Sequence, residues 1–118
     1  MKDASDLLTR LYARFNARDI EAVLALLDED VMWANGMDGG HVHGRDGVRQ
    51  YWTRQWSMID PHVAPLSFTS AADGSTVVEV YQTVRSLTGE ILREQDVGHI
   101  FHIRDGMIVR LDIRGATG

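Results

Sequence analysis

The chain has 118 residues, of which 44% are hydrophobic and 25% charged, and its formal net charge is −5. This composition is typical of a folded globular protein, and the length predicts one domain over residues 1–118. The absence of cysteine excludes disulfides, thiolate metal sites and thiol nucleophiles. Charged residues interrupt every apolar run near the start, so we expect neither a signal peptide nor a membrane span, and a cytoplasmic location.

The basic residues do not indicate nucleic-acid binding. Three of them, Arg10, Arg14 and Arg18, recur every four residues on one face of a predicted helix. However, 17 acidic residues outnumber 12 basic ones, whereas nucleic-acid binders need a basic surface that outweighs the acids. We therefore interpret this face as solvated and expect no nucleic-acid partner.

Two helices are predicted first. Leu7, Leu11 and Phe15 recur at helical spacing, which predicts a helix over 3–17. Asp19 is suited to cap a second helix, whose apolar residues continue to Leu27 and which we expect to end among the acids at 28–30.

A short strand, a loop and a third helix follow. Residues 31–35 are predicted as a strand, and the glycine-rich segment 36–44 as a flexible loop. The next apolar pattern predicts a helix from about 46 to 58. Pro61 and Pro65 then predict a connection into a sheet.

From residue 66 the hydrophobic period changes to two, which is typical of strands. Turn signals at 73–74, 88–89 and 105–106 separate four predicted strands, at 66–71, 77–87, 90–104 and 107–114. Helices first and sheet afterwards is the α+β pattern. We therefore predict an α+β fold with N-terminal helices packed on a strongly curved antiparallel sheet of four to five strands, because long antiparallel strands twist.

Strand alternation sorts the side chains of 96–104 into two faces. Val97, His99 and Phe101 share one face, which we expect to point towards the helices together with the last-strand residues Val109, Leu111 and Ile113. Ile100 and His102 would lie on the outer face. Its partly apolar character predicts a homodimer surface there.

His99 is the principal candidate for catalysis. One interpretation is a core histidine whose nitrogens are satisfied by the protein. The other is a neutral imidazole in a semi-apolar pocket, able to donate to a carbonyl or to shuttle a proton. Other residues could line the same pocket, and most of them are aromatic, which favours a flat apolar ligand. These candidates are Tyr12, Trp33, Asn35, Tyr51, Trp52 and Trp56.

His41 and His43 form a His-x-His pair beside Asp38. Residues two apart on a strand can share one metal ion, but no third ligand is fixed by spacing. We therefore favour a loop over the pocket mouth, with His41 as a rim residue that contacts the substrate. No metal or cofactor is expected.

Two segments, 14–31 (RFNARDIEAVLALLDEDV) and 43–52 (HGRDGVRQYW), followed by the glycine-turned hairpins, resemble the SnoaL-like branch of the nuclear-transport-factor-like superfamily. That superfamily includes ketosteroid isomerase, scytalone dehydratase, limonene epoxide hydrolase and polyketide cyclases. The resemblance implies a conical, cystatin-like α+β fold, a deep pocket and dimerisation through the convex sheet face. It is specific for fold rather than chemistry, because such folds include catalysts and non-catalytic binders.

The resemblance also assigns positions of the ketosteroid isomerase site. The tyrosine of the first helix falls on Leu11, one residue before Tyr12, and the proton-shuttling aspartate falls on Asn35, whose amide cannot accept that proton. The protonated acid that donates to the oxyanion falls on His99, which as a neutral imidazole can still donate. The pocket aromatics fall on Tyr51 and Trp52.

Two functions of different classes follow. The first is a cofactor-free lyase, cyclase or isomerase acting on a small apolar carbonyl compound. In this enzyme His99 is the acid-base group, Asn35 holds the substrate oxygen, and Asp96 or His41 supplies a second proton carrier. The second is a non-catalytic module that binds a small ligand or dimerises, favoured by the missing acid at Asn35.

Overall fold

The structure, a computed structural model, describes residues 4–36 and 38–114. Within these residues the elements are, in chain order, α1 (Ala4–Asn16), α2 (Ile20–Leu24), β1 (Leu27–Ala34), β2 (His41–His43), α3 (Gly44–Trp56), β3 (Asp60–Ser70), β4 (Thr76–Arg85), β5 (Ile91–Arg104) and β6 (Met107–Arg114). All six strands form one sheet in the order β2-β1-β6-β5-β4-β3. The predicted α+β class is confirmed, with more strands than the four to five expected.

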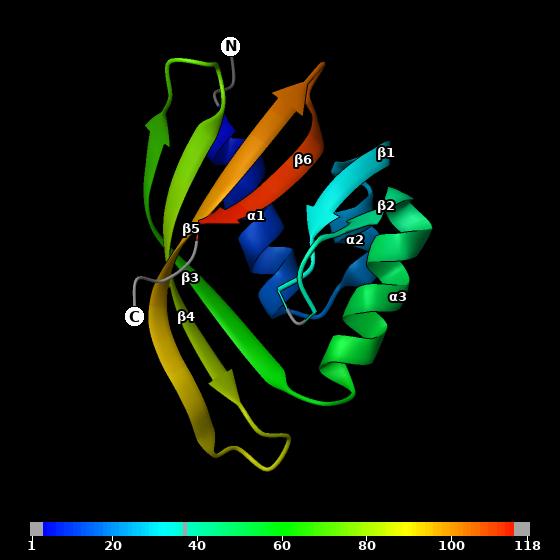
Figure 1. Ribbon diagram of the computed structural model, residues 1–118, viewed down its shortest axis with the longest axis vertical. Helices are drawn as coiled ribbons and strands as arrows, with labels where there is room; N and C mark the ends of the chain where they lie inside the picture. The colour runs from blue at the N-terminus through cyan, green and yellow to red at the C-terminus, as the bar shows by residue number, and fades with distance from the viewer. Residues whose placement is uncertain (1–3, 37, 115–118) are drawn as a thin grey trace.

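The long strands β3, β4 and β5 form consecutive antiparallel hairpins, as predicted. Figure 1 shows these strands curving past α1, while α3 lies beside β1 and β2. The β5–β6 connection is a tight turn in which Asp105 and Gly106 both have positive φ, at 54° and 78°. Two consecutive positive φ angles define the type I′ turn that suits the twist of a hairpin, which is why Asp-Gly marks this turn in the sequence.

One pair of neighbouring strands is parallel, which the sequence did not predict. β1 pairs with β6 in parallel, with Leu27 opposite Ile108 and Trp33 opposite Leu111. The second helix consequently ends at Leu24 rather than among the acids. The Ile108 N–H donates to the Leu26 carbonyl (3.0 Å), so pairing with a distant strand replaces local helix propensity at Leu27.

The predicted connection at 60–65 is also part of the sheet. Pro61 and Pro65 lie within β3, opposite Val84 and Val80 of β4. β3 is the last strand of the sheet order. Proline is tolerated there because an edge strand has one side without a neighbour, so that the missing N–H costs no ladder hydrogen bond.

The predicted flexible loop 36–44 contains a short strand instead. β2 pairs antiparallel with β1, with His41 opposite Ala34 and His43 opposite Met32. The Asn35 N–H donates to the Gly40 carbonyl (2.9 Å), which closes the turn between the two strands. The third helix starts at Gly44, two residues earlier than predicted, and the first helix begins at Ala4, residue 3 of its predicted span lying outside the described residues.

The inward face of β5 is as predicted, since Val97, His99 and Phe101 are all buried. The prediction for β6 was wrong in part, because Ile108 and Leu111 are both buried although they differ in strand parity. The register shifts between His102 and Ile103, and this bulge moves Ile108 to the inner side.

Candidate functional site

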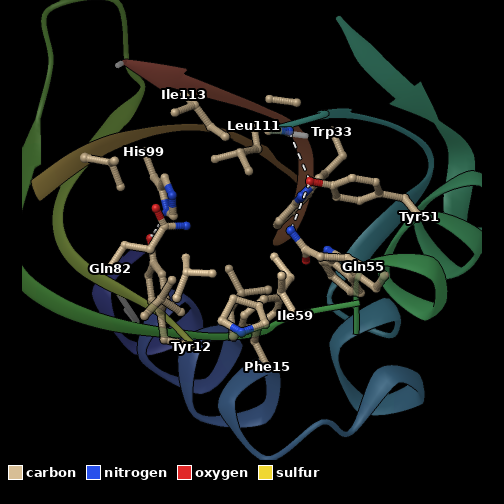
Figure 2. A pocket seen from close by; sticks show the side chains of 18 of the residues that line it. Tyr12, Phe15, Trp33, Tyr51, Gln55, Ile59, Gln82, His99, Leu111 and Ile113 are labelled. Carbon is tan, nitrogen blue, oxygen red and sulfur yellow. Dashed lines mark hydrogen bonds between the residues drawn. The ribbon is translucent and has the colours of Figure 1, made fainter. Parts of the chain in front are cut away.

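A cavity of about 400 Å³ lies between the concave sheet face and the helices α1 and α3. This volume is within the range of small-molecule sites. Figure 2 shows its aromatic and polar side chains converging from α1, α3 and the strands. The cavity is lined by Leu11, Tyr12, Phe15, Trp33, Ala34, Gly36, Tyr51, Trp52, Gln55, Ile59, Pro61, Val63, Gln82, Val84, Arg93, Gln95, Val97, His99, Phe101, Leu111 and Ile113.

Tyr12 and His99 form a buried pair on this wall. The Tyr12 hydroxyl lies 2.7 Å from His99 Nδ1, and the two rings are nearly parallel, with centroids 5.8 Å apart. Their relative exposures are only 3% and 9%. Phe101 lies edge-on to both rings. Helix α1 supplies the phenol and β5 the imidazole, so the pair exists only because the sheet curls around α1.

Burial determines the protonation of this pair. It lowers the pKa of His99 to about 4 and raises the pKa of Tyr12 well above its ordinary value. At neutral pH both groups are therefore uncharged. A neutral imidazole has one donor and one acceptor nitrogen. When the Tyr12 O–H donates to Nδ1, Nε2 carries the ring proton; when Nδ1 donates to Tyr12, Nε2 becomes a base.

The His99 ring is open to the cavity through its second nitrogen. No protein partner for Nε2 is found in the described part of the chain, and His99 is one of the lining residues. The pair can therefore present either a proton donor or a proton acceptor to a bound molecule. These are the two states that general acid-base chemistry requires.

Aromatic rings form much of the remaining wall. Trp33 and Trp52 meet edge to face at 5.2 Å, and Phe15 lies edge-on to Trp52 at 5.5 Å. Tyr51 accepts hydrogen bonds from Gly36 N–H (3.0 Å) and Gln55 Nε2 (3.3 Å). Gln55 Oε1 is buried without a hydrogen-bond partner among the described residues, which leaves it available to a ligand donor.

Three predicted site residues lie away from this wall. The Asn35 side-chain oxygen accepts the Asp38 N–H (2.9 Å), so the amide supports the β1–β2 turn. Trp56 stacks on Trp52 with ring centroids 5.8 Å apart, and the Arg18 guanidinium lies over the Trp56 ring at 4.9 Å. His41 lies in β2 and contacts Asp112 on the outer face of β6 rather than covering the cavity.

Four polar residues that line the cavity were not predicted from the sequence: Gln55, Gln82, Arg93 and Gln95. Gln95 Nε2 donates to Gln82 Oε1 (2.9 Å) across the β4–β5 pair. Strand parity was the available signal, because residues 93 and 95 share the face of Val97 and His99.

No group of three or more His, Asp or Glu side chains suitable for a metal ion is found within residues 4–36 and 38–114.

In the same residues, no helix combines the length and apolar character that crossing a bilayer requires.

Comparison with known proteins identifies a family and a shared fold. The SnoaL-like domain matches residues 8–111. TerC, co-crystallised with polyporic acid, is 28% identical (TM-score 0.82), the match covering 95% of this chain and 90% of TerC. An NTF2-like protein of unknown function from Burkholderia pseudomallei K96243 is 26% identical (TM-score 0.83; 97% and 91% covered).

A third solved structure, a proposed polyketide cyclase from Pseudomonas putida KT2440, is 24% identical (TM-score 0.78; 99% and 94% covered) and supports the fold alone. Among curated proteins there is no significant match.

Proposed function

This chain belongs to the SnoaL-like family, and on that premise we propose that it is a cofactor-free isomerase or cyclase acting on a small, apolar carbonyl compound. The observation that carries the proposal is the Tyr12–His99 pair, buried and uncharged on the wall of an aromatic cavity. TerC, which is 28% identical, was co-crystallised with polyporic acid, and this supports a small organic ligand for the present chain.

In the proposed reaction His99 Nε2 takes a proton from the carbon next to the carbonyl. The electron pair of that C–H bond moves to the carbonyl oxygen and gives an enolate. On a β,γ-unsaturated carbonyl compound this enolate is a dienolate: the imidazolium returns the proton to its γ-carbon, the carbonyl re-forms, and the carbon–carbon double bond moves into conjugation with it. Because burial disfavours the charged ring, the proton is returned readily and no external acid, base or cofactor is consumed.

Each remaining residue has a role in this proposal. For Nε2 to act as the base, the Nδ1–H of His99 donates to the Tyr12 hydroxyl, which orients the ring. Trp33, Tyr51 and Trp52 contact the flat carbon skeleton. The other three predicted residues do not contact the substrate in this proposal. Asn35 supports the β1–β2 turn, Trp56 packs against Trp52, and His41 pairs with Asp112 on the outer face.

The test is solvent exchange of the α-protons of 2-tetralone, a flat ketone, followed by NMR in D₂O. Replacing the proton carrier in His99→Gln should slow enzyme-dependent exchange at least ~100-fold. His102→Gln removes a histidine from the outer face and should retain the wild-type rate. Equal exchange in the His99→Gln and wild-type proteins would contradict the proposal.

The second candidate is a non-catalytic ligand-binding module. It is favoured by the cavity lining, which contains no Asp or Glu among the described residues, and by Asn35 at the position that the family resemblance assigns to the proton-shuttling acid. This candidate predicts ketone binding without exchange above the uncatalysed rate in any variant. Binding measured by tryptophan fluorescence then separates the two candidates.

We also propose that the protein is a cytoplasmic homodimer that associates through the outer sheet face. Large apolar side chains are exposed on the long hairpins, including Tyr81, Leu92 and Leu66. Exposed apolar groups that gather on one surface favour association. Sedimentation of wild type and Leu92→Asp tests this, since the variant should be monomeric if the face is the interface.

A further inference from the structure

Arg93 is the one residue of the cavity wall with a formal charge at neutral pH, among the residues that the structure describes. His99 is neutral because of its burial, and no Asp or Glu contributes to the described wall. We propose that the ligand carries an acidic group, a carboxylate or an ionised enol, which Arg93 binds at the cavity rim. This inference rests on the proposed function and adds one acidic group to its otherwise apolar carbonyl substrate.

Strand alternation places the charges on opposite faces of β5. Arg93, Gln95 and Val97 all line the cavity. The acids between them have the opposite parity, and Glu94 accepts a hydrogen bond from the Tyr81 phenol, which raises the pKa of Tyr81. In a chain with a net charge of −5, this sorting produces a positive cavity rim that attracts an anion.

Arg93 is available for a ligand. Its side chain is exposed, and it makes no ion pair in the described part of the chain. A guanidinium presents a fork of N–H donors that fits both oxygens of a carboxylate. Next to it, Gln95 and Gln82 are joined by one hydrogen bond (2.9 Å), which leaves amide groups that can bind a neighbouring ligand oxygen.

The spacing along β5 limits the length of the ligand. Arg93 and His99 lie six positions apart on one strand, and this stretch spans about 20 Å when extended. Both residues line the cavity, so a ligand that contacts both side chains would place its acidic group and its reacting carbonyl ~10–15 Å apart. A skeleton of two or three aromatic rings meets this requirement and the measured volume.

The experiment compares two probes that differ only in charge, 4′-acetylbiphenyl-4-carboxylate and its primary amide, by isothermal titration calorimetry. Wild type should bind the carboxylate about 5- to 10-fold more tightly than the amide at low salt, and the difference should shrink at high salt. Arg93→Gln should remove the preference, and Arg93→Lys should retain part of it. Arg104→Gln, at the other end of β5 and outside the cavity wall, should behave as wild type.

Three outcomes would overturn the inference. Equal binding of both probes by wild type, with His99-dependent exchange of 2-tetralone intact, contradicts the acidic ligand but not the proposed function. A carboxylate preference that persists in Arg93→Gln contradicts the role of Arg93. Absence of binding by both probes, together with absence of exchange, contradicts the inference and the proposed function alike.

Discussion

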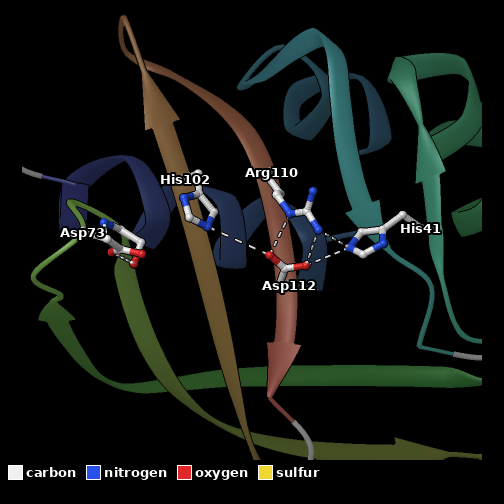
Figure 3. Close-up of polar contacts among 6 residues, drawn as sticks. His41, Asp73, His102, Arg110 and Asp112 are labelled. Atoms are coloured by element: carbon white, nitrogen blue, oxygen red, sulfur yellow. Dashed lines mark hydrogen bonds and ion pairs between the residues drawn. The ribbon is translucent and has the colours of Figure 1, made fainter.

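The protein contains histidines in two clusters of polar side chains that differ in their access to water, an inner one around His99 and an outer one around Asp112. His99 lies inside the cone against the Tyr12 phenol. On the outer face, His41 and His102 approach Asp112, which also accepts hydrogen bonds from Arg110 (Figure 3). The inner histidine is 9% exposed, whereas the side chains of His41 and His102, which share Asp112 as a partner, are 25% and 37% exposed.

The difference shows in the charge each cluster carries. The hydrogen bond from Arg110, followed by that from His41, lowers the pKa of Asp112, so the outer carboxylate is ionised at neutral pH. Inside, burial suppresses charge on both partners. Solvent access rather than residue type therefore decides which of the two sites carries charge at neutral pH.

The largest expected effect on stability is the pH dependence due to His99. Its pKa is about 4 in the folded protein and about 6.5 when unfolded. Between these values the unfolded chain binds more protons, so the free energy of unfolding falls as the pH drops from 6.5 to 4. The loss from this residue should reach about 3 kcal/mol.

Urea titrations at several pH values, run on wild type and His99→Gln, isolate this contribution. The two stability curves should converge towards pH 4, because the variant lacks the titrating ring. His102→Gln should keep the wild-type slope. Parallel curves for wild type and His99→Gln would show that the His99 ring is not dry.

A smaller effect is expected for Tyr12→Phe. Removing the hydroxyl leaves the buried His99 Nδ1 without its partner, which should lower the free energy of unfolding by about 1–2 kcal/mol. Tyr81→Phe, on the outer face, is the matched control and should change stability by less than ~0.5 kcal/mol. Equal losses in both variants, measured by urea denaturation, would argue against a special pair.

The smallest effect is expected for Asp112→Asn in the outer cluster. The carboxylate has several partners, but the cluster is accessible to water and ions. The loss of stability should stay below about 1 kcal/mol and disappear in high salt. A salt-independent loss of several kcal/mol would place the outer cluster in the same class as the inner pair.

Much of the fold was predictable from local patterns, because hairpin turns and strand alternation depend on residues that are neighbours in the sequence. Asp105-Gly106 and the inward His99 are examples. The predictions that were wrong concern segments whose structure depends on pairing with residues far away in the sequence. The second helix ends early because β6 pairs with the chain at Leu27, and Pro61 fits in a strand because that strand is an edge.

The site was predictable to a similar extent. The positions of Tyr12, Trp33, Tyr51, Trp52 and His99 on one cavity wall follow from periodicity and strand parity. The Tyr12–His99 contact needed the curvature of the sheet, since it joins residues 87 positions apart. Asn35 was misplaced because its side chain stabilises a turn whose geometry the sequence does not specify.

The position of β6 between β1 and β5 has a consequence for biosynthesis. While the ribosome is still making the chain, β1 and β5 each expose an unpaired edge, and the sheet remains split into two pieces. Such edges are prone to mispairing with other chains. The wall that β1, β5 and β6 form around the cavity is therefore complete only once β6 has been synthesised.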